Sequence, residues 1–135
     1  MSSRGFDILT AEESTKLLAT HTFGRVVAKV GAEPAAYPVY YVYVDDAIVY
    51  RTDPGTKLAA AVLHSRVSFE VDDDVEGWSV MAFGPCEEVR RPQEVEALRV
   101  ALGTDWPDAE RQRVVRIIPD RITGRRLQHR RSAEE

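Results

Sequence analysis

The feature that most constrains the fold is a series of short apolar segments separated by tight turns. Val67, Phe69 and Val71 alternate with polar neighbours, which is the pattern of a strand with one buried face. Asp45-Asp46 predicts a hairpin turn, because aspartate tolerates the backbone angles of tight turns. The expected strands are 24–31, 36–44, 47–51, 66–72, 77–89 and a last strand that begins at 114–119 and continues past a turn over 122–127. Such connections join antiparallel strands that must hide their edges, so we predict a mainly β, six-stranded antiparallel barrel with flanking helices.

Two longer helices are expected beside the barrel. Thr10 and Glu13 have the spacing of a capping box, which predicts a helix from about Ala11 to Ala19. The segment Pro92–Leu102 has apolar residues on one helical face, and Gly103 follows it as a typical helix end.

The turn after the 47–51 strand contains a conflict of charge. Asp53 is expected to cap a short helix that has Pro54 at its first position. Lys57 then places a cation in the first helical turn, where it opposes the helix dipole. A bound anion would remove the conflict, and Arg51 could supply a second positive charge. We therefore predict a phosphate site, with a solvated turn and an ordinary surface lysine as the alternative, since the spacing is not that of a P-loop.

Composition limits the class of protein. A chain of 135 residues with 44% hydrophobic and 30% charged residues fits a single globular domain spanning residues 1–135. The net charge of −4 argues against broad nucleic-acid binding. No run approaches the ~20 apolar residues of a membrane span, and the N-terminus lacks the apolar part of a secretory signal. We expect a cytoplasmic protein without nucleic-acid or membrane partners.

The usual catalytic motifs do not occur in the sequence. There is no nucleophile elbow, no GxGxxG after a first strand and no HExxH. Cys86 excludes an intrachain disulfide, and we interpret it as a buried, inert thiol rather than a catalytic one. Asp72-Asp73-Asp74 is interpreted as a hairpin turn and not as a metal loop. No metal site is predicted and the catalytic residues stay unknown, so a bound cofactor would carry the chemistry of any enzyme built on this chain.

Several segments, in this order, resemble the pyridoxamine 5′-phosphate oxidase-like family, and more narrowly its short actinobacterial-type branch with the FMN-binding split barrel. They are Gly24–Val27, Pro34–Tyr41, Val49–Leu58, Gly77–Gly84 and Val115–Arg126. The resemblance covers nearly the whole chain. It implies a six-stranded antiparallel split β-barrel and a homodimer with two flavin (FMN) sites at the subunit interface.

The resemblance also implies a set of cofactor-binding residues, namely Pro38, Val39, Tyr40, Arg51, Thr52, Thr56, Lys57, Trp78 and Ser79. In such families the lysine at position 57 contacts the flavin phosphate, with the neighbouring threonine assisting. Residues 51–52 would meet the phosphate or the polar edge of the ring, and the 38–40 backbone would lie against the isoalloxazine. Residues 78–79 would approach across or near the interface, although a tryptophan suits core or dimer packing equally well.

The sequence therefore predicts an FMN-dependent oxidoreductase that acts on an unidentified small molecule. Oxidation of vitamin B6 is not expected, because the chain lacks the C-terminal segment with Trp, Arg and His that holds the vitamer in true pyridoxamine 5′-phosphate oxidases. One alternative is a deazaflavin-dependent reductase, with Arg125, Arg126 and Arg130 beside the site as partners for an acidic cofactor tail. The other is a non-catalytic module that binds a flavin or another ligand.

Overall fold

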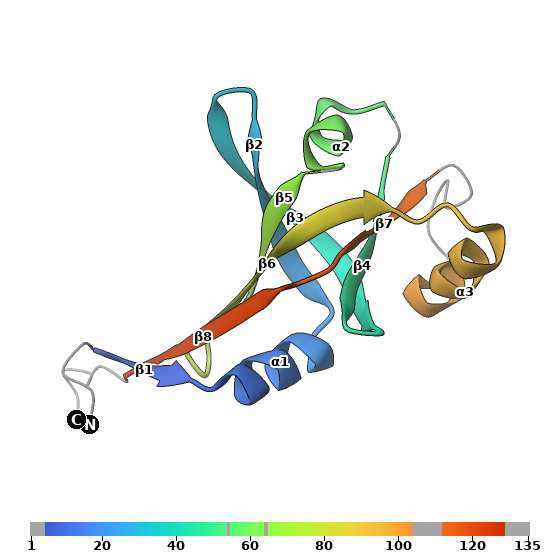
Figure 1. The fold of residues 1–135 in the computed structure, drawn as a ribbon. Helices are drawn as coiled ribbons and strands as arrows, with labels where there is room; N and C mark the ends of the chain where they lie inside the picture. The colour runs from blue at the N-terminus through green and yellow to red at the C-terminus, as the bar shows by residue number, and fades with distance from the viewer. Residues whose placement is uncertain (1–4, 54, 64, 104–111, 129–135) are drawn as a thin grey trace.

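The fold is a closed ring of six antiparallel strands extended by two more (Figure 1). The computed structural model describes residues 5–53, 55–63, 65–103 and 112–128, and of Lys57, Leu58 and Ala61 the backbone alone. The ring runs in the order β6-β5-β2-β3-β4-β7, and a β6–β7 pairing closes it. The strands are β1 (Phe6–Leu9), β2 (Phe23–Val30), β3 (Glu33–Val44), β4 (Ala47–Thr52), β5 (Arg66–Asp73), β6 (Trp78–Glu88), β7 (Arg113–Ile117) and β8 (Arg121–Leu127). The predicted six-stranded barrel is confirmed.

Two strands of the ring divide their pairing between different neighbours. The first part of β6 pairs with β5 and β8, whereas Cys86–Glu88 pairs with β7. In the same way, residues 33–40 of β3 pair with β2, and residues 41–44 pair with β4. A strand that changes partners must bend. Residues 33–40 of β3 are not paired with β4, and we call this gap between the two strands the split of the barrel.

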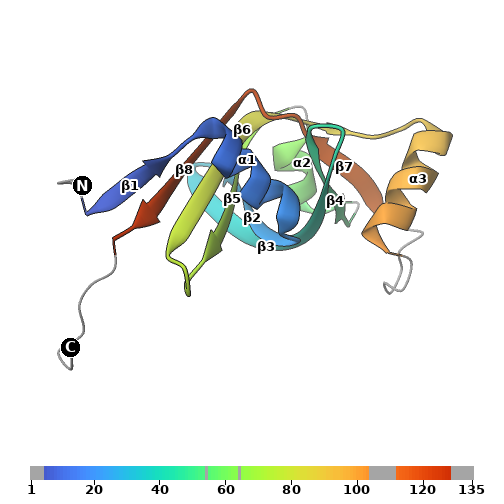
Figure 2. The ribbon, with the colours of Figure 1, turned by 90° about the horizontal axis from the view of Figure 1, so that it is seen from below.

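The barrel interior holds a single apolar core. Val26, Phe69, Trp78 and Ile117 are all at most 2% exposed, as the period-two pattern of their strands requires. Helix α1 (Ala11–Thr20) lies beneath the barrel (Figure 2), and its Leu18 joins this core. Helix α3 (Pro92–Leu102) packs on a second, smaller cluster formed with β4 and β7. None of the described helices is long and apolar enough to cross a membrane.

The helix signals at α1 and α3 are confirmed. The Thr10 hydroxyl accepts a hydrogen bond from the Glu13 backbone N–H, and the Glu13 carboxylate accepts one from the Thr10 N–H, both at 3.0 Å. Gly103 ends α3 as predicted. The predicted Asp45-Asp46 hairpin is also present, with φ of 50° and 61° at the two aspartates.

The predicted start of the short helix is wrong. Helix α2 runs from Lys57 to Val62, and its N-cap is Thr56, whose hydroxyl accepts from the Ala59 N–H at 3.0 Å. Gly55 has a φ of +82°, so the chain turns there and begins the helix later than an Asp53 cap would allow. Pro54 lies outside the described residues. Strand β1 was not expected either, since its partner β8 is far away in the sequence.

Candidate functional site

The split between β3 and β4 forms a pocket. The last residue pair between the two strands is Tyr41 with Tyr50, and the next residues along, Tyr40 and Arg51, line a cavity of about 300 Å³. Pro38 and Val39 continue the β3 wall. Four of the residues predicted to bind a cofactor are thus brought together in one place.

The wall formed by β3 is mainly apolar. Tyr40 is 57% exposed and Phe23, on β2, is 45% exposed, and their rings lie edge to face with centroids 5.1 Å apart. Large aromatic groups exposed to water are unfavourable, because their apolar surface must be hydrated. A ligand or a second chain that covers the two rings would remove this apolar area from solvent.

The opposite wall carries positive charge. One Nη of Arg51 donates to the backbone carbonyl oxygen of Arg99 at 3.4 Å, and Arg99 donates to the Gln112 carbonyl oxygen at 2.8 Å. Partial burial lowers the pKa of Arg51, and the nearby charge of Arg99 lowers it further. A guanidinium still keeps its proton at neutral pH, so an anion placed here would relieve the repulsion between the two arginines.

The turn leading to α2 differs from the predicted phosphate cradle. The Thr56 hydroxyl serves as the helix cap, and Thr52 ends β4 beside Arg113. With only six residues, α2 has a smaller dipole than the prediction assumed. The side chain of Lys57 lies outside the described part of the structure, so its contact with a phosphate stays a prediction.

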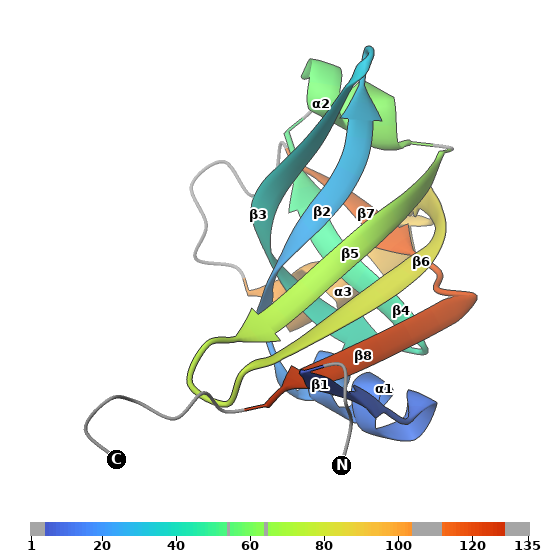
Figure 3. The same cartoon turned by 90° about the vertical axis from the view of Figure 1, so that its left-hand side faces the viewer.

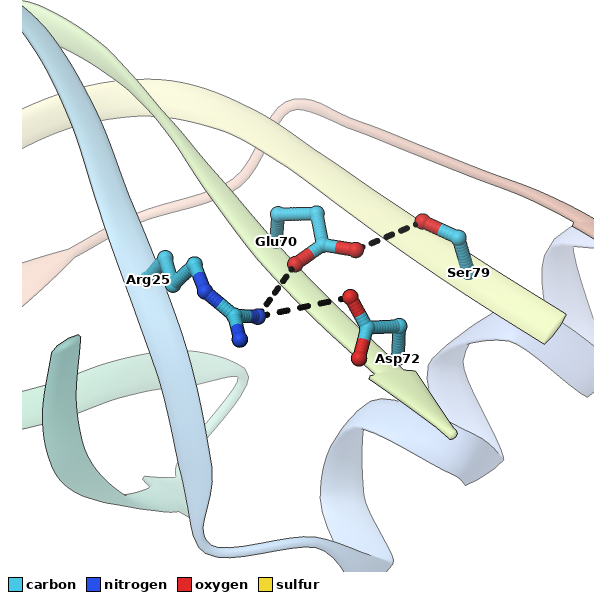
Figure 4. Close-up of polar contacts among 4 residues, drawn as sticks. All are labelled: Arg25, Glu70, Asp72 and Ser79. Atoms are coloured by element: carbon cyan, nitrogen blue, oxygen red, sulfur yellow. Dashed lines mark hydrogen bonds and ion pairs between the residues drawn. The ribbon is translucent and has the colours of Figure 1, made fainter. Parts of the chain in front are cut away.

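Trp78 and Ser79 do not line this pocket within one chain. Trp78 is 2% exposed, and its ring packs edge-on against His21 with centroids 4.8 Å apart. The Ser79 hydroxyl donates to Glu70 at 2.8 Å, in a cluster that also includes Arg25 (Figure 4). Both residues belong to β6, which two strands, β5 and β2, separate from β3. Their predicted approach from a second subunit is therefore untested.

Some lining residues were not anticipated from the sequence. Phe23 follows the same alternation as Arg25, so extending the predicted strand by one residue would have found it. Leu102 and Gln112 reach the pocket from either side of residues 104–111, and no local signal marks them. The arginines proposed for an acidic cofactor tail lie elsewhere: Arg125 and Arg126 are on β8, and Arg130 is outside the described residues.

Catalytic chemistry by side chains is not prominent in the described residues. They contain no group of three or more His, Cys, Asp or Glu that could hold a metal ion. Cys86 is 1% exposed, and burial raises the pKa of its thiol to about 11, which fits the predicted inert role. The described pocket therefore offers binding and orientation: an apolar wall, a cationic wall and the strand edge between them.

Comparison with known proteins gives consistent matches. The family model described as pyridoxamine 5′-phosphate oxidase matches residues 10–126. An uncharacterised protein from Mycobacterium tuberculosis is 34% identical over 135 residues, covering 93% of this chain and 88% of that protein. The structure of the FAD binding protein from Mycobacterium smegmatis superposes with a TM-score of 0.74 at 34% identity, covering 90% of this chain and 98% of that one. A conserved protein of unknown function from Corynebacterium diphtheriae has a TM-score of 0.77 at 30% identity, with 92% and 99% covered.

Proposed function

This chain belongs to the pyridoxamine 5′-phosphate oxidase family, and from that premise we propose that it is a flavin-dependent oxidoreductase whose cofactor occupies the pocket between β3 and β4. The observation that carries the proposal is the pairing of an apolar strand wall with a guanidinium at one pocket. A flavin nucleotide has the same two parts, a flat and largely apolar ring and an anionic phosphate tail.

The size and chemistry of the pocket fit part of such a cofactor. Ligand pockets usually measure roughly 300–1,000 Å³, and the cavity of about 300 Å³ lies at the lower end of that range. Residues 38–40 of β3 are not paired with β4. A strand edge without a partner presents backbone N–H and C=O groups that can pair with the polar edge of a ring. A second chain at the pocket mouth would enlarge the site.

Each part of the pocket has a proposed task. Pro38, Val39 and Tyr40 support one face of the ring and exclude water from it, while Arg51 and Lys57 hold the phosphate. The bound flavin would supply two-electron transfer to or from a small substrate. The side chains position the reacting partners and keep the site dry, since the described lining of the pocket contains no carboxylate, imidazole or thiol.

We propose FMN as the bound flavin, because the sequence resembles the family branch with the FMN-binding split barrel. The relative from Mycobacterium smegmatis is described as binding FAD, and a deazaflavin is the remaining alternative. Equilibrium titration of the apoprotein with each of the three compounds separates them. The proposal expects FMN to bind at least as tightly as FAD, and a clear preference for FAD or deazaflavin would replace FMN.

Substitution of Arg51 tests the location of the site. Arg51→Gln removes the charge but keeps a polar side chain, and we expect flavin nucleotide to bind about tenfold or more weakly, because a hydrogen bond to a charged group contributes roughly 1.5–3 kcal/mol. Lys57→Ala should have an effect of similar size. Fluorescence quenching of added FMN measures both.

A matched control comes from β7. Arg113 is exposed, lies 3.4 Å from Glu88 and is not among the residues that line the cavity, so Arg113→Gln should leave binding unchanged. Equal binding by the wild type, Arg51→Gln and Lys57→Ala would place the flavin elsewhere. Bound flavin that is never reduced or reoxidised by any donor or acceptor would favour a non-catalytic binding module instead.

A further inference from the structure

Gln112 lines the pocket but has no part in holding the ring or the phosphate. It directly precedes β7 and borders the cavity of about 300 Å³ between β3 and β4. Its Oε1 atom is buried and has no hydrogen-bond partner among the residues that the structure describes. A buried acceptor without a partner is unfavourable, because it has given up its hydrogen bonds to water. Such an atom beside a cavity indicates that a bound molecule supplies the missing donor.

The other polar groups of Gln112 are already engaged. Its Nε2 donates to the Asp53 carboxylate at 3.1 Å, and its backbone carbonyl oxygen accepts from Arg99 at 2.8 Å. The contact with Asp53 identifies the amide nitrogen, because an ionised carboxylate only accepts hydrogen bonds. The side chain is half-buried and the last torsion of a glutamine is soft, so Oε1 can turn toward the cavity without a shift of the backbone.

The remaining lining of the pocket limits what this donor can be. Its other described polar side chains are Tyr40 and Arg51, and a guanidinium offers donors only. A fully ionised phosphate ester supplies acceptors only, so it would serve Arg51 and leave Gln112 without a donor. The pocket therefore fits a ligand that carries an O–H or N–H group close to its anionic group.

The position of Gln112 places this donor near the phosphate end of the proposed site. Strands β4 and β7 lie side by side below α2 in the view of Figure 3, and they pair as far as Thr52 opposite Arg113. Gln112 continues beyond that pair and contacts Asp53, so it lies two residues, about 7 Å, past Arg51 in the direction of α2. Helix α2 begins with the lysine that we assign to the phosphate.

We propose that Oε1 of Gln112 accepts a hydrogen bond from a ribityl hydroxyl of the bound flavin, an inference that rests on the proposed function. The ribityl chain joins the phosphate to the ring, so its hydroxyl groups are the donors nearest to the phosphate. The N–H donor of the oxidised ring is the imide, which lies at the opposite end of the nucleotide. FMN, FAD and deazaflavin share the chain, so the inference does not depend on which of them binds.

This contact makes Gln112 a specificity residue for the ribityl chain. A site that hydrogen-bonds a hydroxyl group discriminates against an analogue without it, because the analogue leaves the polar group of the site unpaired. The apolar β3 wall, by contrast, contacts the ring and does not read the chain.

Fragments of the flavin test the inference. Lumiflavin has the ring with a methyl group in place of the ribityl chain, riboflavin has the chain, and FMN adds the phosphate. Gln112→Leu removes the acceptor at a similar side-chain size. We expect it to bind riboflavin and FMN about fivefold more weakly, the usual effect of one neutral hydrogen bond, and to bind lumiflavin as the wild type does. Fluorescence titration of each compound with apoprotein measures the affinities.

Control variants separate the acceptor from its surroundings. Asp53→Ala removes the partner of Nε2 but keeps Oε1, so it should weaken riboflavin binding less than Gln112→Leu does. Gln93→Leu makes the same exchange at an exposed residue of α3 that does not line the cavity, and it should leave every affinity unchanged. Gln112→Asn withdraws the amide by one methylene, and this milder change should fold and repeat the pattern of Gln112→Leu.

The outcomes distinguish this inference from the proposed function. Equal binding of riboflavin and FMN by the wild type and Gln112→Leu would overturn the inference and leave the flavin site in place. An equal weakening for lumiflavin would also overturn it, because Gln112 would then serve the ring. A wild-type protein that binds none of the three compounds would contradict the proposed function, and the inference with it.

Discussion

At the scale of single residues, the barrel interior contains titratable groups that burial keeps neutral. The Tyr50 hydroxyl and the Cys86 sulfur are 3.8 Å apart, and both residues are at most 1% exposed. Burial raises the pKa of Cys86 to about 11 and also raises the pKa values of Tyr41 and Tyr50. Ionising any of them would put a charge into an apolar core, so the folded state favours their protonated forms.

This produces a defined dependence of stability on pH. The thiol titrates near 9 when unfolded and near 11 when folded, so the stabilisation is complete below pH 9 and is lost as the pH rises from 9 to 11. The expected loss is on the order of 2 kcal/mol. Cys86→Ala should delay the onset to about pH 10, where the tyrosines begin to ionise in the unfolded chain. Urea unfolding between pH 8 and 11 measures the difference, and identical profiles for the two proteins would contradict it.

At the scale of elements, the critical feature is the change of partners along β6. Gly84 pairs with Val67 of β5 and lies two residues before Cys86, where β6 begins to pair with β7. A Cβ at this position would lie within van der Waals overlap of the Ile118 carbonyl oxygen, which belongs to the backbone and cannot rotate away. Ile118 in turn donates its N–H to the Pro85 carbonyl oxygen at 3.0 Å, so the crossing is tightly fixed.

Gly84→Ala should therefore open the barrel at this crossing. We expect a loss of about 3 kcal/mol or more in the free energy of unfolding, because backbone must move to make room. Gly31→Ala is the matched control: its Cβ would meet nothing within 4 Å, and only the φ of +66° is unfavourable, so about 1 kcal/mol should be lost. Denaturant unfolding of both variants compares them, and equal losses would show that the contact with Ile118 is not decisive.

At the scale of the whole molecule, local patterns were sufficient for the barrel. Alternation and hairpin turns such as Asp45-Asp46 specify neighbouring antiparallel strands, and the capping box at Thr10 fixes the start of α1. They were not sufficient for β1, because its pairing with β8 joins the two ends of the described chain. They also misplaced α2, since the conformation of Gly55 depends on how the turn meets the rest of the fold.

The site was predictable where it follows the strands. Residues 38–40 and Arg51 lie within two strands that the sequence predicts. The structure brings them together at the split between β3 and β4. Leu102 and Gln112 enter the pocket through tertiary packing, which one sequence does not display. The separation of Trp78 and Ser79 from the pocket within one chain makes their role depend on a second copy of the protein.

The central claim is that the split between β3 and β4 holds a flavin. The most direct test is the absorbance spectrum of the purified protein after incubation with FMN or FAD and gel filtration. We expect a flavin spectrum that stays with the wild-type protein and is lost from Arg51→Gln. A wild-type protein that emerges colourless after incubation with either flavin would contradict it.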